Sequence, residues 1–212
     1  MDTKGLIEAL AADAKRPAAS LSSVWWGAAG LSAAFAGLAV YLALGARPDL
    51  AAAAETARFL FKFVAMLTLA AGAFALVRAL SRPGEGWRKP LTLLAAAPAL
   101  IVLAVLIELV VLPPDAWGPS LVGANSLACF LSISLIGLGP LAAFLLTLRH
   151  GAPTRPGLAG AAAGLLAGAL AATFYALHCT DDSPLFLSTW YTAALATLTA
   201  TGAAGARWLV RW

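Results

Sequence analysis

Charged residues are scarce in this chain, since ten acidic and fourteen basic side chains make up only 11% of its 212 residues. Soluble domains usually carry about 25% charged residues. Hydrophobic residues instead reach 61%, and the mean hydropathy is +0.87. This balance excludes an ordinary soluble globular protein and indicates an integral membrane protein.

The chain also lacks the short motifs by which many enzymes are identified. It contains no Cys-x-x-Cys pair, Walker loop, His-Glu-x-x-His motif or Gly-x-Ser-x-Gly elbow, and it has only two cysteines and two histidines. These absences leave enzyme activity without support. We therefore expect a protein that is not an enzyme and does not bind nucleic acid directly.

Long apolar runs account for most of the sequence. A helix needs about 20 residues, at about 1.5 Å each, to cross about 30 Å of hydrocarbon. The runs are continuous rather than alternating, which favours membrane helices over a β-barrel. Ser183 is predicted to cap the last helix and Pro184 to be its first residue. We predict an all-α integral membrane protein with six transmembrane helices, at approximately residues 24–44, 59–80, 91–112, 126–148, 158–178 and 185–210.

Lysine and arginine are distributed unequally between the two sides that this topology defines. Three of them, Arg47, Arg58 and Lys62, lie on one side, and eleven lie on the side of both termini. Positively charged residues are retained in the cytoplasm. We therefore predict a multi-pass membrane protein with both termini in the cytoplasm. The eleven are Lys4, Lys15, Arg16, Arg78, Arg82, Arg88, Lys89, Arg149, Arg155, Arg207 and Arg211.

Both cysteines fall on the side that positive charge avoids, which suggests an outward-facing sensor. Cys129 is predicted about one turn into the fourth helix, and Cys179 directly after the fifth. Thiolates and imidazoles bind zinc and softer metal ions, and two nearby thiols can alternatively form a disulfide. The spacing does not choose between these. The candidate metal ligands are Cys129, His178, Cys179, Asp181 and Asp182.

A purely structural interpretation of the same residues is also open. Free cysteine is often buried for packing alone, and His178, Asp181 and Asp182 could cap helix ends. The acidic neighbours would raise a thiol pKa, which argues against a reactive redox pair. We expect no resident cofactor, and the candidate ligand is a transient soft or zinc-like metal ion.

Two charged residues are predicted inside the membrane, Lys62 in the second helix and Glu108 in the third. Lys62 is predicted to snorkel to the outer interface, and an ion pair between the two is a further hypothesis. The fifth helix carries Gly160, Gly164 and Gly168 at a spacing of four, which predicts close approach by another helix.

The first 22 residues are predicted to form a cytoplasmic tail ahead of a membrane bundle at residues 23–212. If residues 2–15 form a short amphipathic helix, Leu6, Ile7, Leu10 and Ala14 share one face. The opposite face is mixed in charge rather than basic, which favours docking on a soluble protein over binding to anionic lipid. A simple interfacial anchor is the alternative.

Several segments of the chain resemble the NrsF-type membrane anti-sigma factors. The most specific is Tyr-Ala-Leu-His-Cys-Thr-Asp-Asp-Ser-Pro-Leu-Phe at residues 175–186. The similarity runs nearly from end to end, although the first and third helices match mainly in hydrophobic character. The other matching segments are residues 6–13, 47–50, 61–63, 123–129 and 148–156, together with Glu108 ahead of Leu112-Pro113.

This resemblance implies six membrane helices, a place in the bacterial inner (cytoplasmic) membrane and a role in transcription regulation. Members of the family hold an extracytoplasmic-function sigma factor inactive at the inner membrane, and envelope stress from heavy metals or oxidants releases it. Cys129 and Cys179 match the family's cysteine motifs, so the resemblance implies that they sense the stress. The tail lacks the His-x-x-x-Cys-x-x-Cys zinc motif of soluble anti-sigma domains, so sigma binding is expected to use the tail, the inner loops or both.

Two other functions are compatible with the residues. A small transporter or channel would use Lys62, Glu108 and the glycine-rich fifth helix, but these charges lie near the outer ends rather than at the midplane, where substrate sites usually form. An outward-facing thiol oxidoreductase would use Cys129 and Cys179 as a redox pair, but it generally needs an electropositive setting for the reactive thiol.

Overall fold

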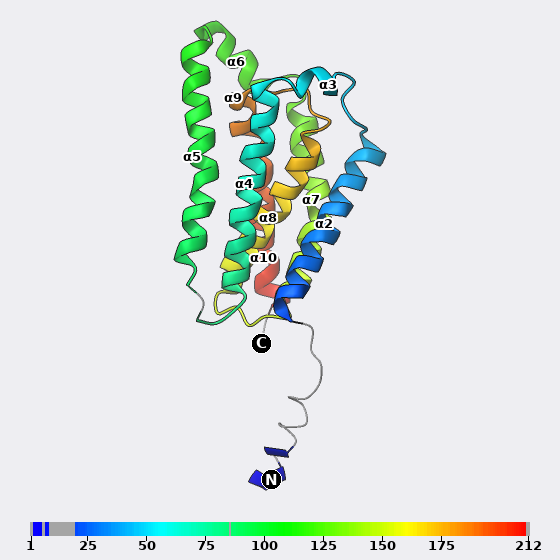
Figure 1. Ribbon diagram of the computed structural model, residues 1–212, viewed down its shortest axis with the longest axis vertical. Helices are drawn as coiled ribbons and strands as arrows, with labels where there is room; N and C mark the ends of the chain where they lie inside the picture. The colour runs from blue at the N-terminus through cyan, green and yellow to red at the C-terminus, as the bar shows by residue number, and fades with distance from the viewer. Residues whose placement is uncertain (1, 6, 9–19, 85, 211–212) are drawn as a thin grey trace.

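The computed structural model (Figure 1) describes residues 2–5, 7–8, 20–84 and 86–210, and within these ranges its regular structure is helical. The predicted all-helical class is confirmed for these residues. The long helices are α2 (Leu21–Ala43), α4 (Ala57–Leu80), α5 (Arg88–Val111), α7 (Ser126–Leu148), α8 (Pro156–Tyr175) and α10 (Thr192–Leu209). The short elements are α3 (Leu50–Ala53), α6 (Pro114–Val122), α9 (Pro184–Phe186) and the π-helix η1 (Leu187–Tyr191).

Capping residues fix where several of these helices begin. The side chain of Ser20 accepts a hydrogen bond from the backbone N–H of Ser23 at 3.1 Å at the start of α2. Ser183 accepts one from the N–H of Leu185 at 3.2 Å, and Pro184 is the first residue of α9. A proline fits there because its missing N–H would have no partner in the first turn. The predicted start of the last helical segment is therefore confirmed.

Helix α8 lies at the centre of the bundle and packs against α2, α4, α7 and α10 (Figure 1). A Cβ atom on Gly160 would lie 2.2 Å from the carbonyl oxygen of Gly202, and one on Gly164 would lie 2.1 Å from that of Leu198. At Gly168 the nearest atoms belong to flexible side chains. The predicted close approach of another helix is confirmed at Gly160 and Gly164, where only glycine fits.

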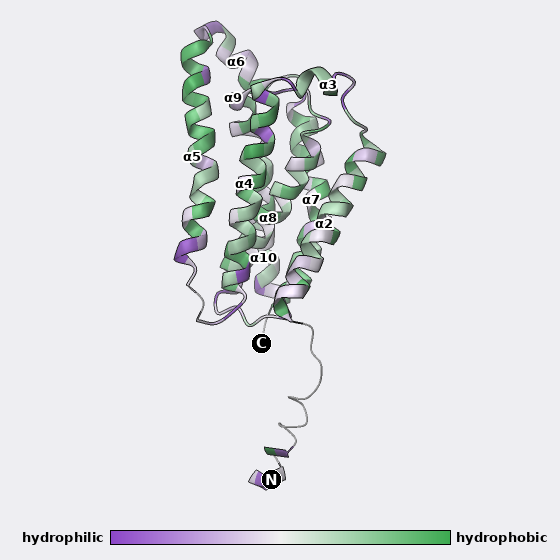
Figure 2. Cartoon of the chain, in the orientation of Figure 1, coloured by the Kyte–Doolittle hydropathy of each residue, from purple (hydrophilic) through white to green (hydrophobic). Residues whose placement is uncertain are grey.

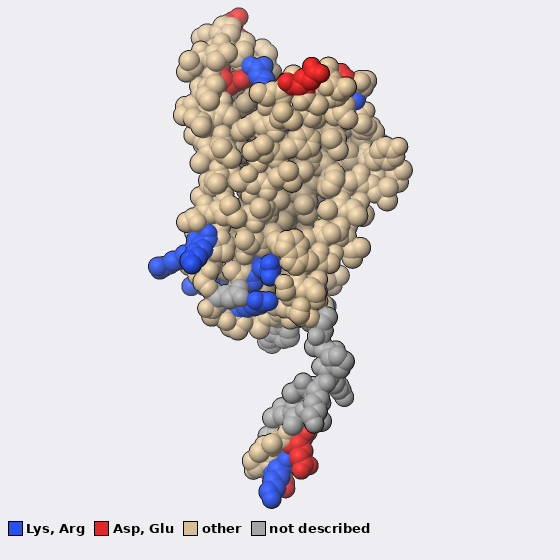
Figure 3. Space-filling model, viewed as in Figure 1, with Lys and Arg blue, Asp and Glu red and all other residues tan. Residues whose placement is uncertain are grey.

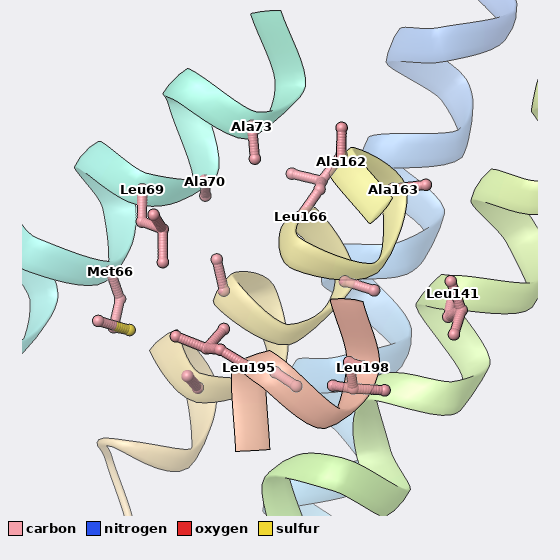
Figure 4. Close-up of a cluster of buried hydrophobic side chains, with 14 of the residues drawn as sticks. Met66, Leu69, Ala70, Ala73, Leu141, Ala162, Ala163, Leu166, Leu195 and Leu198 are labelled. Carbon is pink, nitrogen blue, oxygen red and sulfur yellow. The ribbon is translucent and has the colours of Figure 1, made fainter. Parts of the chain in front are cut away.

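The core consists mainly of small and aliphatic side chains, many of them from α4, α7, α8 and α10. Ala73 of α4, Leu141 of α7, Leu166 of α8 and Leu198 of α10 are among the buried residues that meet there (Figure 4). Small residues on α4 and α8 bring their backbones close together, and the leucines fill the remaining space. Such a core gains its stability from close packing.

Helix α5 stands at the edge of the bundle, where it packs mainly on α4 and also meets α9 and η1 (Figure 1). Its outward side chains are apolar, and Val110 is 86% exposed in the isolated chain. Hydrophobic residues also cover most of the length of the bundle, with hydrophilic ones gathered towards its two ends (Figure 2). An apolar surface of this extent suits contact with lipid rather than water.

Among the residues that the structure describes, five helical stretches are long and apolar enough to cross a membrane: Leu21–Ala43, Ala57–Leu80, Arg88–Val111, Pro114–Leu148 and Pro156–Tyr175. They correspond to the first five predicted spans, and the fourth stretch also takes in α6. The sixth predicted span, at 185–210, is not among them. It is divided between α9, η1 and α10, and α10 contains four threonines and an arginine, which lower its hydropathy.

The two ends of the bundle differ in charge (Figure 3). Helix α2 begins and α10 ends at the same end, which we call the basic end (Figure 1). The opposite end, which we call the acidic end, holds the loops around α3, α6 and α9. Described cations at the basic end are Arg78, Arg82, Arg88, Lys89, Arg149, Arg155 and Arg207. Described charges at the acidic end are Asp49, Glu55, Glu108, Asp115, Asp181 and Asp182, with Arg47, Arg58 and Lys62.

Candidate functional site

The two cysteines lie together at the acidic end of the bundle. Cys129 is in the first turn of α7, and Cys179 follows the end of α8, where its N–H donates to the carbonyl oxygen of Tyr175 at 3.0 Å. Both side chains are buried, and both are free thiols. The two thiols interact with each other, and the thiol of Cys179 donates a weak hydrogen bond to the carbonyl oxygen of Asp181 at 3.9 Å. The structure therefore places a reduced dithiol between α7 and the end of α8.

The segment Cys179 to Ser183, which we call the cysteine turn, connects α8 to α9. Side chains and carbonyl groups of this turn contact the α2–α3 connection, α4, α5 and the α6–α7 loop. These are the elements that make up the acidic end of the bundle. The turn that carries Cys179 is therefore also the point at which the separate helices are joined.

Asp181 links the cysteine turn to the helix that carries the other cysteine. Its carboxylate accepts hydrogen bonds from the backbone N–H groups of Ala124 and Asn125 at 3.1 and 2.9 Å, and from the Asn125 side-chain amide at 2.9 Å. The carbonyl oxygen of Asn125 in turn accepts from the N–H of Cys129 at 2.8 Å. Asp181 thus holds the start of α7 against the turn and so fixes the relative position of the two thiols.

Asp182 joins the turn to two buried cations. Arg47 donates to its carboxylate at 2.9 Å, and Lys62 forms an ion pair with the same group. Both cations also donate to the carbonyl oxygen of Cys179, Arg47 at 3.2 Å and Lys62 at 3.0 Å. The hydrogen bonds of Arg47 with Asp49 and Asp182 raise the pKa of its guanidinium group, and the same contact with Arg47 lowers the pKa of the Asp49 carboxyl.

The third connection of the cysteine turn reaches α5. The hydroxyl of Ser183 donates to the carboxylate of Glu108 at 3.1 Å, and Arg58 of α4 forms an ion pair with the same carboxylate at 3.0 Å. The hypothesis of a pair between Lys62 and Glu108 is therefore wrong. Lys62 also does not snorkel outward, because its side chain is 1% exposed and is directed into the turn.

The five candidate metal ligands do not form one cluster. His178 uses its Nδ1 atom in a hydrogen bond with the carbonyl oxygen of Gly45 at 3.1 Å, and the carboxylates of Asp181 and Asp182 are occupied by the partners given above. In the part of the chain that the structure describes, no three His, Cys, Asp or Glu side chains are grouped to hold a metal ion. The structure thus brings Cys129 and Cys179 together and leaves the other three apart from them.

The setting of Cys179 differs from the one expected from its acidic neighbours. The interaction with the Cys129 thiol lowers the pKa of Cys179, and the ammonium group of Lys62 lowers it further, against the opposing effect of burial. The expectation of a raised thiol pKa is wrong for Cys179, because it considered the acidic neighbours and left out Cys129 and Lys62. Arg47 and Lys62 lie in the family-like segments 47–50 and 61–63, and Lys62 was also marked by its predicted place inside the membrane.

The predicted partner-binding face of the tail falls mostly outside the described residues. Leu6, Leu10 and Ala14 lie outside them. Ile7 is helical and 60% exposed, so nothing described in the bundle covers it.

Comparison with known proteins gives matches along the whole chain. The family model NrsF, described as negative regulator of sigma F, matches residues 10–212. An anti-sigma-F factor NrsF of Caulobacter vibrioides (strain NA1000 / CB15N) is 37% identical over 218 residues, covering 100% of both chains. A probable anti-sigma-F factor NrsF of Azospira oryzae (strain ATCC BAA-33 / DSM 13638 / PS) is 35% identical over 227 residues, again covering 100% of both. No solved structure matches.

Proposed function

The chain belongs to the NrsF family of anti-sigma factors, and from that premise we propose that it sequesters an extracytoplasmic-function sigma factor at the bacterial inner membrane and releases it under envelope stress from metals or oxidants. The observation that carries the sensing part is the buried dithiol at the acidic end. Its turn joins the helices at that end, so a chemical change there acts on several helices together.

The proposed topology has six membrane passages with both termini in the cytoplasm. It is supported by the separation of charge, since positive residues favour the cytoplasmic side and the described cations gather at the basic end (Figure 3). For the sixth passage, α9, η1 and α10 run continuously from Pro184 to Leu209. A π-helical turn within a longer helix keeps most backbone groups paired, so it is compatible with a membrane segment. In this topology the acidic end faces outward.

The proposed signal is a change in the bonding of Cys129 and Cys179. A disulfide or a thiolate–metal bond would draw the start of α7 and the cysteine turn into a different relative position. To move a two-state equilibrium from 1:99 to 99:1 takes about 5.5 kcal/mol of differential free energy. A disulfide contributes about 2–4 kcal/mol and a structural metal site more, so either supplies that order of energy. The cysteine turn would pass the change to α4 through Lys62 and to α5 through Ser183.

Replacing either cysteine by serine is expected to abolish stress-induced release while leaving sigma binding intact. Serine has nearly the same shape, but it forms neither a disulfide nor a soft-metal bond. The measurement is reporter transcription from a sigma-dependent promoter, with and without peroxide or metal, beside co-purification of the sigma factor in mild detergent. Thr180→Ser, on the exposed part of the turn, is the matched control and should respond normally. A Cys129→Ser/Cys179→Ser protein with an unchanged response would overturn the sensing role.

The tail, residues 1–22, is the proposed sigma-binding segment, and residues 23–212 are the proposed sensor bundle. Leu6→Asp or Leu10→Asp is expected to reduce sigma co-purification at least tenfold and to give constitutive transcription, because a carboxylate would be placed on the apolar face. Lys4→Gln changes the opposite, polar face and should leave binding unaltered. If both aspartate variants retained the sigma factor at the level of the Lys4→Gln control, the tail would be excluded from the interface.

A further inference from the structure

Two adjoining clefts at the basic end of the bundle share Thr154 and Arg155, in the segment that leads into α8. The larger cleft, of about 650 Å³, lies between the start of α8 and the end of α10 and is also lined by Arg207. The smaller cleft, of about 270 Å³, lies against the end of α4 and is also lined by Arg82 and Trp87. Arginines from three separate parts of the chain therefore line neighbouring hollows at the end where cations gather (Figure 3).

The larger cleft has its positive charge concentrated at the start of α8. Arg155 directly precedes the helix, and the side chain of Arg207 lies across its first turn, because a Cβ atom on Gly157 would be 2.9 Å from the Nε atom of Arg207. Among the described residues, no acidic side chain lies in that first turn and none caps the helix. Guanidinium groups bind phosphate through two parallel hydrogen bonds. The cleft thus suits a phosphate group.

An apolar groove of about 530 Å³ lies along the side of the bundle, between α5 and α10 and over α4 and α8. Leu158 lines the larger cleft and Leu165 lines the groove, seven residues apart on α8. Arg207 of the cleft and Ala203 of the groove are four residues apart on α10, which is about 6 Å along the helix axis at about 1.5 Å per residue. Residues at these spacings share one face of a helix. The groove therefore continues from the cleft along the same face of the α8–α10 pair.

We propose that the larger cleft and the groove together bind an anionic phospholipid, whose phosphate lies between Arg155 and Arg207 and one of whose acyl chains lies in the groove. Basic pockets between membrane helices bind anionic headgroups. The groove takes a hydrocarbon chain, because its lining is apolar and the hydroxyl of Thr199 already donates to the carbonyl oxygen of Leu195 at 2.7 Å. A free phosphate would leave the groove empty, and a soluble acidic protein would not reach it within the bilayer. The inference rests on the membrane location of the bundle and is independent of the cysteine turn.

The test is lipid binding by the purified full-length protein in mild detergent, followed by native mass spectrometry and by the melting temperature. Dioleoyl phosphatidylglycerol is compared with dioleoyl phosphatidylcholine, which has the same chains but no net charge, and with glycerol phosphate, which has no chains. At about 100 times its Kd, phosphatidylglycerol should raise the melting temperature by at least about 5 °C, and the other two by less than about 1 °C. Equal stabilisation by phosphatidylcholine or by glycerol phosphate would overturn the proposal.

Arginine variants test the headgroup part of the site. Arg155→Gln/Arg207→Gln is expected to weaken phosphatidylglycerol binding at least about tenfold, because both charged donors to the phosphate are removed. Arg88→Gln is the matched control, since it removes one exposed cation from the same end but does not line either cleft. Should the double variant lose its cooperative unfolding transition, Arg155→Gln alone is compared with Arg88→Gln. Equal weakening in Arg155→Gln and Arg88→Gln would show that only the overall charge of this end matters, which would overturn the site.

Two adjacent alanines of α10 test the acyl-chain part. Ala203 lines the groove, whereas Ala204 is exposed and is not part of its lining. A leucine at position 203 would fill space that the acyl chain needs, so Ala203→Leu should lose at least half of the rise in melting temperature that phosphatidylglycerol produces. Ala204→Leu should keep the full rise. An equal rise in the two variants would remove the groove from the site.

These measurements contain no sigma factor, so this proposal and the anti-sigma function can fail separately. Loss of lipid binding with normal sigma release would leave the proposed function in place. If Arg155→Gln/Arg207→Gln lost sigma co-purification but kept its lipid-dependent stabilisation, the clefts would belong to a protein interface and the lipid site would be overturned. A native mass spectrum of a dimer without bound phospholipid would likewise assign the groove to a second copy of the chain.

Discussion

The Gly164→Leu protein is expected to lose its folded bundle, and Gly164→Ala to be severely destabilised. A Cβ atom at this position would lie 2.1 Å from the carbonyl oxygen of Leu198 and 2.9 Å from the Cα of Thr199, so it meets the backbone of α10. Backbone cannot move aside as a flexible side chain can, and the two helices would have to separate. Because α8 is the central helix, that separation disturbs its packing on α4 and α7 as well.

The expected size of the alanine effect is about 3 kcal/mol or more, at the upper end of the overpacking range. It is measured as a loss of melting temperature in detergent, followed by circular dichroism and by retention of a monodisperse elution profile. Gly27→Ala is the matched control, since a Cβ there would have nothing within 4 Å. On a helix exposed at that point it should be neutral or should stabilise by about 0.5–1 kcal/mol. Equal melting temperatures for Gly164→Ala and Gly27→Ala would contradict the close α8–α10 contact.

Much of the fold could be predicted because the bilayer sets the length of an apolar run and the breaks between runs carry prolines and caps. The prediction was less successful where a helix departs from that rule. Residues 113–125 were left as a connection between two predicted spans, yet Pro114 begins the nine-residue helix α6. In the last segment, a π-helical turn and the threonines of α10 interrupt the uniform apolar pattern, and no sequence period predicts such a turn.

The sequence predicted on which side of the membrane the candidate site residues lie, but not which of their side chains touch. Counting charges placed both cysteines at one end, but it could not say which cation would meet which acid. Arg58 and Lys62 are four residues apart on α4, so they lie on the same face and either could have reached Glu108. In the structure Arg58 takes Glu108, and Lys62 turns inward to Asp182. That choice depends on where the cysteine turn folds back over α4, which is tertiary structure.

Lys62→Met is expected to destabilise the acidic end of the bundle by about 3–5 kcal/mol, which corresponds to a melting temperature lower by roughly 10 °C. The substitution keeps an unbranched side chain of similar length but removes the ammonium group. The carbonyl oxygens of Cys179 and Asp181 then each lose one donor, and Asp182 loses one of its two described counter-charges and keeps Arg47. Removing one partner of a buried pair leaves the other desolvated and unpaired, which is the costly case.

Lys89→Met provides the matched control, because the same substitution is made at an exposed position in the first turn of α5. Its expected effect lies within about 0.5 kcal/mol.

The pairing of Lys62 with Asp182 is isolated by a double-mutant cycle with Asp182→Asn. If the two groups interact, the double variant should be less destabilised than the sum of the single variants, by a coupling of roughly 1–3 kcal/mol. Additive losses would show that Lys62 acts on the turn through its carbonyl contacts and not through Asp182. A Lys62→Met protein as stable as Lys89→Met would mean that the cysteine turn is held in place without Lys62, because Arg47, Asp181 and Ser183 would then suffice to join it to the bundle.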